Sequence, residues 1–450
     1  MKMFGTNGIR GVANEYMCPE LAVQVGKSIG FTLKVKKIAI ACDPRTSSQM
    51  IVSAVCSGLT SIGIDVLDLG IVPTPALQYY VKTHDDIGGG VMITASHNPP
   101  QYNGIKCIAG DGTEFTKAQE SAVEDAYETE IECVSWDKIG HISKVEGAGD
   151  GYIDAVISKI NADAVRKAKI KIVLDCSNGA ACETTPMMMK KLGVEIIPLN
   201  CVMDGTFPGH ESEPTEENLQ TLIKTVGETD AVAGMAHDGD ADRCVFVTGS
   251  GKYVPGDLSL ALIAGYKVTA NKGGIVCAPV STSSAVKDTV ESSGGEFRYT
   301  AVGSPIVART MMETGGIFGG EDNGGLIFPE HQYCRDGAMG MAAILEIIAK
   351  KGSLDNLISK LPKYHSIKIT VKCPEGRKKY VSEKVTEKMG SQADTTDGVR
   401  LNYDDGWVLI RASGTEPKFR VYSESSDEKK AKERSENYRR MIEDLIAGKE

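Results

Sequence analysis

The chain has 450 residues, more than a single hydrophobic core usually serves, so we expect several domains. Its 60 acidic and 50 basic residues give a net charge of -10, which argues against nucleic acid as the main ligand. No apolar run reaches the roughly 20 residues of a membrane helix, and MKMFGTNGIRG does not resemble a signal peptide, so we expect a cytoplasmic protein with no membrane partner.

The N-terminal stretch FGTNGIRG contains an arginine, Arg10, between glycines. A flexible backbone beside a guanidinium suits contact with an anion. The same composition also suits a plain turn, so this stretch alone favours neither interpretation.

Three stretches of the chain share one pattern, in which an apolar strand, a small-residue turn and a helical stretch are followed by glycine and another strand. They are residues 37–70, 170–200 and 273–303. Each pattern predicts a βαβ unit, and the continuous Ile/Val runs suit strands covered by helices on both faces. The sequence therefore predicts three related α/β sandwich domains with mixed sheets.

A further strand-like stretch follows each unit and ends in a polar, glycine-rich loop. The three stretches are residues 88–100, 231–246 and 315–328. Ligands of α/β proteins collect at the ends of strands, so we expect the three loops to meet in one cleft. Chance placement of ordinary polar loops is the alternative.

Ser96 lies in the first of these loops, in TASHNPPQYNGIK. Pro99 and Pro100 exclude a helix, so the serine should be presented on a rigid loop. A Ser-His-Asp hydrolase is the weaker interpretation, because the adjacent His97 should point away and no G-x-S-x-G motif is present. The serine fits a phosphoryl acceptor better, with a plain loop hydroxyl as the alternative.

The second loop, HDGDADR, places carboxylates at Asp238, Asp240 and Asp242. Three converging carboxylates repel each other unless a cation lies among them, and oxygen ligands suit one Mg²⁺ per chain. An EF-hand is excluded because its sixth position is Arg243 and its twelfth is Gly249. A solvated turn is the alternative.

The third loop, GGEDNGG, holds Glu321 and Asn323 between glycine pairs. A carboxylate and an amide suit the hydroxyl groups of a sugar, and glycines allow a close backbone approach. A hairpin turn has the same local composition.

The last 85 or so residues predict a smaller C-terminal α+β domain, with three strands and a charged helix from Asp427 to Ala447. The predicted domains are then residues 1–148, 149–250, 251–362 and 363–450.

The stretch RASGTEPKFR in this last domain combines guanidinium groups, hydroxyls and a glycine. Arginine with a cluster of backbone N–H donors grips phosphate without metal, although a turn or a helix cap would use similar residues. The candidate phosphate-binding residues are Arg411, Ser413, Gly414, Thr415 and Arg420.

Twelve cysteines are present, but their spacing does not indicate a zinc site. No pair forms a C-x-x-C motif, and no histidine lies between Cys176 and Cys182, the closest pair. We therefore expect reduced thiols.

The motifs TASHNP, DGDADR, GGEDNGG and RASGT, in this order, resemble the four signature loops of the α-D-phosphohexomutase family. The resemblance covers essentially the whole chain. It implies four domains, the last similar to the TATA-binding-protein fold, and an active enzyme in which Ser96 carries a phosphoryl group. It further implies that the three aspartates bind Mg²⁺, that the third loop binds the sugar, and that the fourth holds the phosphate that is not transferred.

By the same resemblance, Arg10 and Lys106 match positions that assist phosphoryl transfer, and Arg243 contributes to the same site. Many members have serine in place of Asn323, and several bacterial ones have histidine in place of Gly325. We therefore take His331, in HQYCRDG, as the substitute acid/base.

The stretches FGTNGIRG and SGTEPKFRVY are most similar to those of phosphoglucosamine mutases and archaeal phosphomannomutase/phosphoglucomutases. The resemblance implies interconversion of glucosamine 6-phosphate and glucosamine 1-phosphate, with a hexose 1,6-bisphosphate as intermediate and activator. The alternatives are the corresponding mannose or glucose phosphates, a metal-dependent phosphatase and a sugar-phosphate sensor. We expect hexose or hexosamine phosphates as ligands and a monomer or homodimer.

Overall fold

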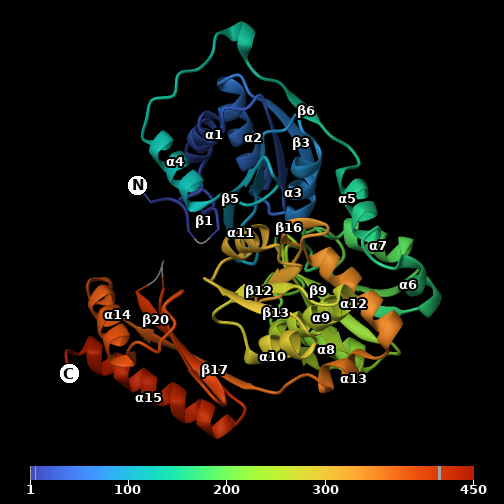
Figure 1. Cartoon of the computed structure of the whole chain (residues 1–450). Coiled ribbons are helices and arrows are strands. Elements are labelled where there is room, and N and C mark those ends of the chain that lie inside the picture. Colours follow the sequence, from blue (N-terminus) through green and yellow to red (C-terminus); the bar gives the residue numbers. More distant parts are fainter. Residues whose placement is uncertain (1, 6, 414–416, 450) are drawn as a thin grey trace. The chain divides into compact units, whose positions relative to one another are not determined.

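The structure is a computed structural model that describes residues 2–5, 7–413 and 417–449. It divides into two compact units, one of Met1–Pro255 with Asn323–Ser359 and the other of Gly256–Asp322 with Lys360–Glu450 (Figure 1). The division between Asp322 and Asn323 falls within the predicted third domain. The four predicted boundaries therefore stay a prediction.

The first sheet of the larger unit has six strands in the order β1-β5-β4-β2-β3-β6. β2 pairs in parallel with β3 and β4, whereas β5 pairs antiparallel with β4 and β1. Its strands are β1 (Ile9–Val12), β2 (Lys37–Cys42), β3 (Asp65–Ile71), β4 (Gly89–Ile93), β5 (Tyr102–Ala109) and β6 (Ile142–Lys144). The accompanying helices are α1 (Pro19–Leu33), α2 (Ser48–Ser61), α3 (Thr74–Thr83) and α4 (Lys117–Tyr127).

The second sheet of this unit has five strands in the order β11-β10-β9-β7-β8. β7 pairs in parallel with β8 and β9, as β2 does with β3 and β4 in the first sheet, and β10 pairs antiparallel with β9. Its strands are β7 (Lys171–Asp175), β8 (Glu195–Leu199), β9 (Ala233–His237), β10 (Cys244–Thr248) and β11 (Tyr253–Val254). Its helices are α5 (Ala148–Ile157), α6 (Ala162–Ala168), α7 (Thr184–Lys191) and α8 (Gln220–Gly227).

The two sheets therefore repeat one topology, as the sequence pattern predicted. In each, a fully buried strand, β4 or β9, is followed by a loop and an antiparallel strand. Continuous apolar runs form these strands because layers cover both faces of the sheet. The loop after β4 carries Ser96 and the loop after β9 carries the three aspartates, so both occupy the equivalent place.

A long connection joins α4 to α5 and runs along the outside of the first sheet (Figure 1, teal). It includes a short 3₁₀ helix, Trp136–Lys138, in which the Trp136 side chain is 86% exposed. Beyond this helix, β6 pairs in parallel with β3, Val66 opposite Ile142. The connection thereby supplies the edge strand of the first sheet.

The larger unit is completed by β15 (Leu326–Phe328), β16 (Gln332–Arg335), α12 (Gly337–Lys351) and α13 (Leu354–Ser359). β15 and β16 pair antiparallel. Asp336 begins α12, because its side chain accepts a hydrogen bond from the backbone N–H of Met339.

The smaller unit contains the third βαβ pattern and the C-terminal domain. β12 (Ile275–Pro279) pairs in parallel with β13 (Glu296–Thr300) and β14 (Phe318–Gly320), accompanied by α9 (Gly256–Asn271), α10 (Ser284–Ser292) and α11 (Ser304–Thr314). An antiparallel sheet in the order β17-β20-β19-β18 follows, with a hydrophobic core between it and two helices. These elements are β17 (His365–Lys372), α14 (Glu375–Met389), β18 (Val399–Tyr403), β19 (Gly406–Ala412), β20 (Lys418–Ser425) and α15 (Glu428–Ile446).

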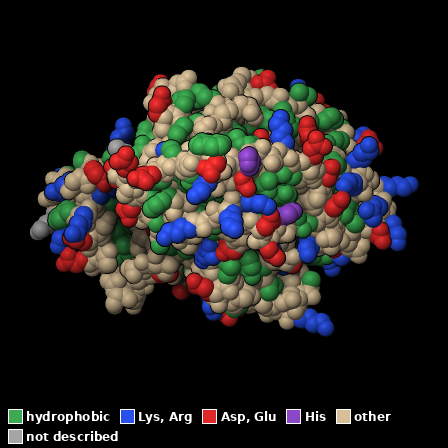
Figure 2. Space-filling view, turned by 90° about the horizontal axis from the view of Figure 1, so that it is seen from above, with side chains coloured by type: hydrophobic (Ala, Val, Ile, Leu, Met, Phe, Trp, Pro, Cys, Tyr) green, Lys and Arg blue, Asp and Glu red, His purple; other side chains and the backbone are tan. Residues whose placement is uncertain are grey.

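The predicted α/β fold with mixed sheets is thus confirmed. In the part of the chain that the structure describes, none of the helices is long and apolar enough to cross a membrane. Basic and acidic side chains are interspersed on the face shown in Figure 2.

Candidate active site

Ser96 lies in the loop of residues 94–101 between β4 and β5, which we call the serine loop. Its side chain is buried, and its backbone adopts a left-handed φ of 54°, unusual for a residue other than glycine. The Thr94 hydroxyl accepts a hydrogen bond from the Ser96 N–H at 2.8 Å and donates one to Asp43 at 2.6 Å. Side-chain contacts therefore hold the serine in an uncommon conformation.

Arg45, which the sequence analysis missed, holds the serine loop in place. Its guanidinium donates to four backbone carbonyls at 2.6–2.9 Å, those of Ser96, Asn98, Pro99 and Tyr102. Asp43 at the end of β2 balances its charge at 3.0 Å, and both side chains are completely buried. The only sequence signal was a charged pair at the end of a buried strand.

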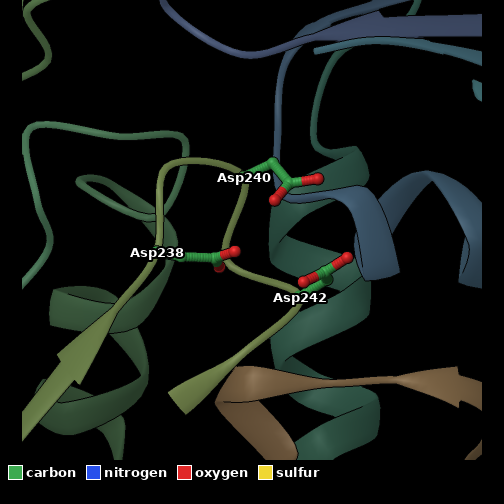
Figure 3. A group of neighbouring side chains, drawn as sticks. All are labelled: Asp238, Asp240 and Asp242. Atoms are coloured by element: carbon green, nitrogen blue, oxygen red, sulfur yellow. The ribbon is translucent and has the colours of Figure 1, made fainter. Parts of the chain in front are cut away.

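The aspartate loop, residues 238–243, joins β9 to β10. Asp238, Asp240 and Asp242 are all buried, and they can each offer an oxygen so that the three atoms lie within 4.8 Å of one another. Figure 3 shows the three side chains projecting to the same side of the loop. The predicted convergence of the carboxylates is confirmed.

The two loops lie against each other. The Ser96 hydroxyl donates to Asp238 Oδ2 at 3.1 Å. A Cβ added at Gly239 would lie 2.7 Å from the Ser96 carbonyl oxygen, so only glycine permits this approach. Thr74, at the start of α3, anchors the aspartate loop by donating its hydroxyl to Asp240 at 2.6 Å and its N–H to the Asp240 carbonyl at 3.0 Å.

Four cationic side chains gather around the three carboxylates. Lys106 lies 2.6 Å from Asp240 and 3.2 Å from Asp242, and Arg243 lies 2.9 Å from Asp238. Arg335 on β16, another residue that sequence reasoning missed, lies 2.6 Å from Asp242. Arg10 is held at the serine loop by its 2.9 Å hydrogen bond to Asn98.

Gly325 provides the room that Arg335 needs. A Cβ at this position would come within 2.3 Å of Arg335 Cδ. Glycine at position 325 therefore leaves room for an arginine whose guanidinium reaches the aspartate loop.

The aspartate loop has buried carboxylate oxygens that suit a cation. Burial alone would raise the pKa of Asp240, but Lys106 and the hydrogen bonds of Lys106 and Thr74 hold it well below its ordinary value. Asp240 Oδ1 and Asp242 Oδ1 are nevertheless buried with no hydrogen-bond partner among the described residues. Unsatisfied carboxylate oxygens at the centre of an oxygen-only set fit Mg²⁺.

The two candidate histidines have different surroundings. His97 Nδ1 lies 3.4 Å from the Ser96 hydroxyl, and burial together with Arg243 and Arg10 lowers the pKa of His97 to about 3. His331 is buried in an aromatic cluster, stacked on Tyr79 with ring centroids 5.0 Å apart, and its Nε2 lies 3.3 Å from Asp336. His331 thus packs among aromatic rings beside Asp336, and its acid/base role stays a prediction.

The remaining candidates are found at strand ends. Glu321 is buried directly after β14 in the smaller unit, whereas Asn323 belongs to the larger unit and accepts a hydrogen bond from the Gly325 N–H at 3.1 Å. Arg411 and Arg420 are directly opposite each other on β19 and β20, so both side chains are on one face of the sheet. Asp397 accepts a hydrogen bond from Arg411 at 2.7 Å.

The fourth loop is only partly described. Ser413 is buried, and its N–H donates to the Lys418 carbonyl at 2.9 Å. Gly414 and Thr415, which the sequence analysis also proposed, lie outside the described residues.

Family models match nearly the whole chain in order. They are phosphoglucomutase/phosphomannomutase alpha/beta/alpha domain I (residues 1–133), domain II (150–251), domain III (255–364) and the C-terminal domain (369–440). A phosphoglucomutase/phosphomannomutase of Thermococcus kodakarensis is 41% identical over 99% of this chain and 100% of its own length. A probable phosphoglucosamine mutase of Methanopyrus kandleri is 40% identical over 99% of both chains. The crystal structure of a phosphoglucomutase/phosphomannomutase family protein from Burkholderia thailandensis matches with a TM-score of 0.88 and 27% identity, covering 99% of this chain and 98% of that one.

Proposed function

The chain belongs to the phosphoglucomutase/phosphomannomutase family and is an isomerase of the phosphohexomutase class, and we propose that it interconverts glucosamine 6-phosphate and glucosamine 1-phosphate. The observation that carries the mechanism is the Ser96 hydroxyl, which is buried 3.1 Å from Asp238 among three carboxylates and four cations.

Ser96 is the phosphoryl carrier in this proposal. Phosphorylated Ser96 gives its phosphoryl group to the free hydroxyl of the sugar monophosphate: the bond between phosphorus and Ser96 Oγ breaks, a bond from phosphorus to the sugar oxygen forms, and the proton of the sugar hydroxyl passes to Ser96 Oγ. The resulting 1,6-bisphosphate then returns its other phosphoryl group to Ser96. The product therefore has its phosphate on carbon 1 where the substrate had it on carbon 6, or the reverse.

The four cations favour charge on the transferring group. Lys106, Arg243, Arg335 and Arg10 bring four positive charges to a centre with three aspartates, so the side chains alone leave one positive charge in excess. Fixed charges in a site without water stabilise the transferring phosphoryl group more strongly than water does.

The aspartate loop would hold one Mg²⁺ through Asp238, Asp240 and Asp242, with Ser96 beside it. The ion, when bound, neutralises charge on the phosphoryl oxygens. Lys106 and Arg335 pair with Asp240 and Asp242 and keep the carboxylates together.

His97 has a positioning role in this proposal. With a pKa of about 3, its imidazole is neutral at physiological pH. In this proposal it orients the Ser96 hydroxyl and adds no positive charge to the site.

Arg411, Arg420 and Glu321 are the residues proposed to bind the rest of the substrate. Arg411 and Arg420 lie directly opposite each other and present two guanidinium groups on one face of their sheet, a set of donors that suits a phosphate group. We assign the non-transferring phosphate to this pair and the sugar hydroxyls to Glu321.

The sugar is tested by comparing kcat/KM for glucosamine 1-phosphate, mannose 1-phosphate and glucose 1-phosphate on one preparation. We expect the amino sugar to be preferred, because the stretches FGTNGIRG and SGTEPKFRVY resemble those of phosphoglucosamine mutases. The alternative is a phosphomannomutase/phosphoglucomutase with the same mechanism, and the names of the relatives include both activities. A clear preference for mannose or glucose would establish that alternative.

The mechanism is tested with Ser96→Ala. The intact mass of the wild type should include one phosphoryl group after incubation with a hexose 1,6-bisphosphate, its activator, and the variant should neither carry it nor isomerise its substrate. Full activity of the variant would overturn the proposal. We expect the enzyme to act in the cytoplasm as a monomer or homodimer.

A further inference from the structure

Two thiols outside the active site lie close enough to react with each other. Cys176 directly follows β7 and Cys201 follows β8, and these strands pair in parallel with Asp175 opposite Leu199. The sulfur atoms are 3.4 Å apart, and both cysteines are free thiols. A disulfide bond of about 2.05 Å would require them to approach by roughly 1.4 Å.

An oxidant can reach one of the two. Cys176 is completely buried, whereas Cys201 is half-buried and lines a surface pocket of about 460 Å³. Cys182 lines the same pocket. Cys201 is therefore the sulfur that a small oxidant meets first.

The two thiols also differ in acidity. The hydrogen bond with Cys176 lowers the pKa of Cys201, whereas contacts with Cys182 and Cys201, together with burial, raise the pKa of Cys176 well above its ordinary value. The accessible sulfur therefore loses its proton more readily than the buried one, as expected of an attacking and a resolving cysteine.

We propose that Cys176 and Cys201 form a modification site, in which hydrogen peroxide converts the pair to a disulfide that controls the two active-site loops. The Cys201 thiolate attacks the peroxide, so that a sulfur–oxygen bond forms and the oxygen–oxygen bond breaks, releasing water after protonation. Cys176 then attacks the Cys201 sulfur: the disulfide forms, the sulfur–oxygen bond breaks, and the leaving hydroxide takes the thiol proton as a second water. The two thiols lose two electrons, which the peroxide gains.

The segment that begins at Cys176 supports the aspartate loop. Ser177 donates its hydroxyl to the His237 carbonyl at 2.5 Å, and the Ala180 N–H donates to the Gly239 carbonyl at 2.9 Å. A Cβ at Gly179 would lie only 2.4 Å from that carbonyl oxygen. A shift of Cys176 is therefore passed directly to the residues between Asp238 and Asp240.

The segment that begins at Cys201 supports the serine loop. Gly205 packs so closely on Arg45 that an added Cβ would lie 2.7 Å from the Arg45 Cα, and the Ser212 hydroxyl donates to the Asn98 carbonyl at 3.2 Å. The disulfide would thus connect the supports of both loops. A misplacement of about 1 Å can cost on the order of 100-fold in rate, so we expect kcat to fall by about 10- to 100-fold.

The test treats the whole protein with hydrogen peroxide and maps peptides without reduction. Wild type should yield one new peptide pair joined through Cys176 and Cys201, lose kcat in parallel, and recover both after treatment with a dithiol. Cys201→Ser should form no such bond and should keep its kcat in peroxide. Cys182→Ser and Cys133→Ser, the latter at an exposed thiol, should behave as wild type.

The two parts of the proposal fail separately. Linkage of Cys176 to Cys182, or oxidation of Cys201 to the sulfinic acid without a disulfide, would overturn the modification site. A linked protein with unchanged kcat would overturn the control of the loops. Peptide mapping does not depend on the proposed function, whereas the loss of kcat rests on it. If the untreated protein has no isomerase activity but still forms the disulfide in peroxide, the proposed function fails and the modification site stands. A thermal unfolding curve of Cys201→Ser like that of wild type shows that the variant is folded.

Discussion

Replacing Arg45 by lysine should slow catalysis strongly while leaving substrate binding nearly intact. The guanidinium donates five hydrogen bonds, one to Asp43, three to carbonyls of the serine loop and one to the carbonyl of Tyr102 at the start of β5. A lysine ammonium keeps the charge but has three donors at a single point. At least two buried acceptors must therefore lose their partner.

The size of the effect follows from these lost bonds. A buried acceptor without a partner costs about 1–3 kcal/mol, so Arg45→Lys should lower the free energy of unfolding by about 2–6 kcal/mol. Proteins typically have about 5–15 kcal/mol, so the variant should still fold at 25 °C. A serine loop displaced by about 1 Å should lower kcat by on the order of 10- to 100-fold.

The assay measures kcat and KM for isomerisation together with thermal unfolding. KM should change little, because the residues proposed to bind the rest of the substrate are elsewhere in the chain. Arg166→Lys, at an exposed arginine paired with Asp163, is the matched control and should resemble wild type. An Arg45→Lys enzyme with unchanged kcat, or one with raised KM alone, would refute the positioning role.

Three further changes test other parts of the site. Asp240→Asn, or chelation of divalent metal from wild type, should abolish turnover but leave monophosphate binding measurable by calorimetry; turnover that survives chelation would contradict the metal site. Gly325→Ala should displace Arg335, because the added Cβ would lie 2.3 Å from Arg335 Cδ. Its kcat should fall toward the roughly 10²- to 10³-fold loss expected of Arg335→Met. An alanine variant as fast as wild type would show that this arginine is dispensable. Burial lowers the pKa of His210, but the Asp175 carboxylate, which lies 3.3 Å from Nε2, outweighs this effect and raises the pKa. Stability from that pair should be fully present below about pH 6.5 and lost as pH rises through the folded pKa, and urea unfolding of His210→Gln should lack this pH dependence.

Much of the fold was predictable because its signals are local. The βαβ repeats follow from apolar runs and glycine turns within about 30 residues. The convergence of Asp238, Asp240 and Asp242 follows from their alternating spacing in one loop. The placement of Ser96 in a buried loop beside them followed from the equivalent position of the loops in two repeats.

What could not be predicted depends on contacts between distant parts of the chain. Arg45 reaches the Ser96 carbonyl across 51 residues, and Arg335 reaches Asp242 across 93. No periodicity or motif marks either arginine. The surroundings of His331 could not be predicted for the same reason. Its aromatic neighbours are Tyr79 and Tyr152, which come from helices far away in the sequence.

The exposed connection between α4 and α5 makes this chain a natural candidate for a split protein. A cut beside Trp136 would leave β6 on the C-terminal fragment, while its partner β3 stays on the N-terminal one. The fragments would also share the ion pair of Lys106 with Asp240 and the hydrogen bond of Ser96 to Asp238. Because Ser96 and the three aspartates would lie on different fragments, isomerase activity would report reassembly of the fragments, and the proposed phosphoryl carrier and the proposed metal site could be supplied by separate genes.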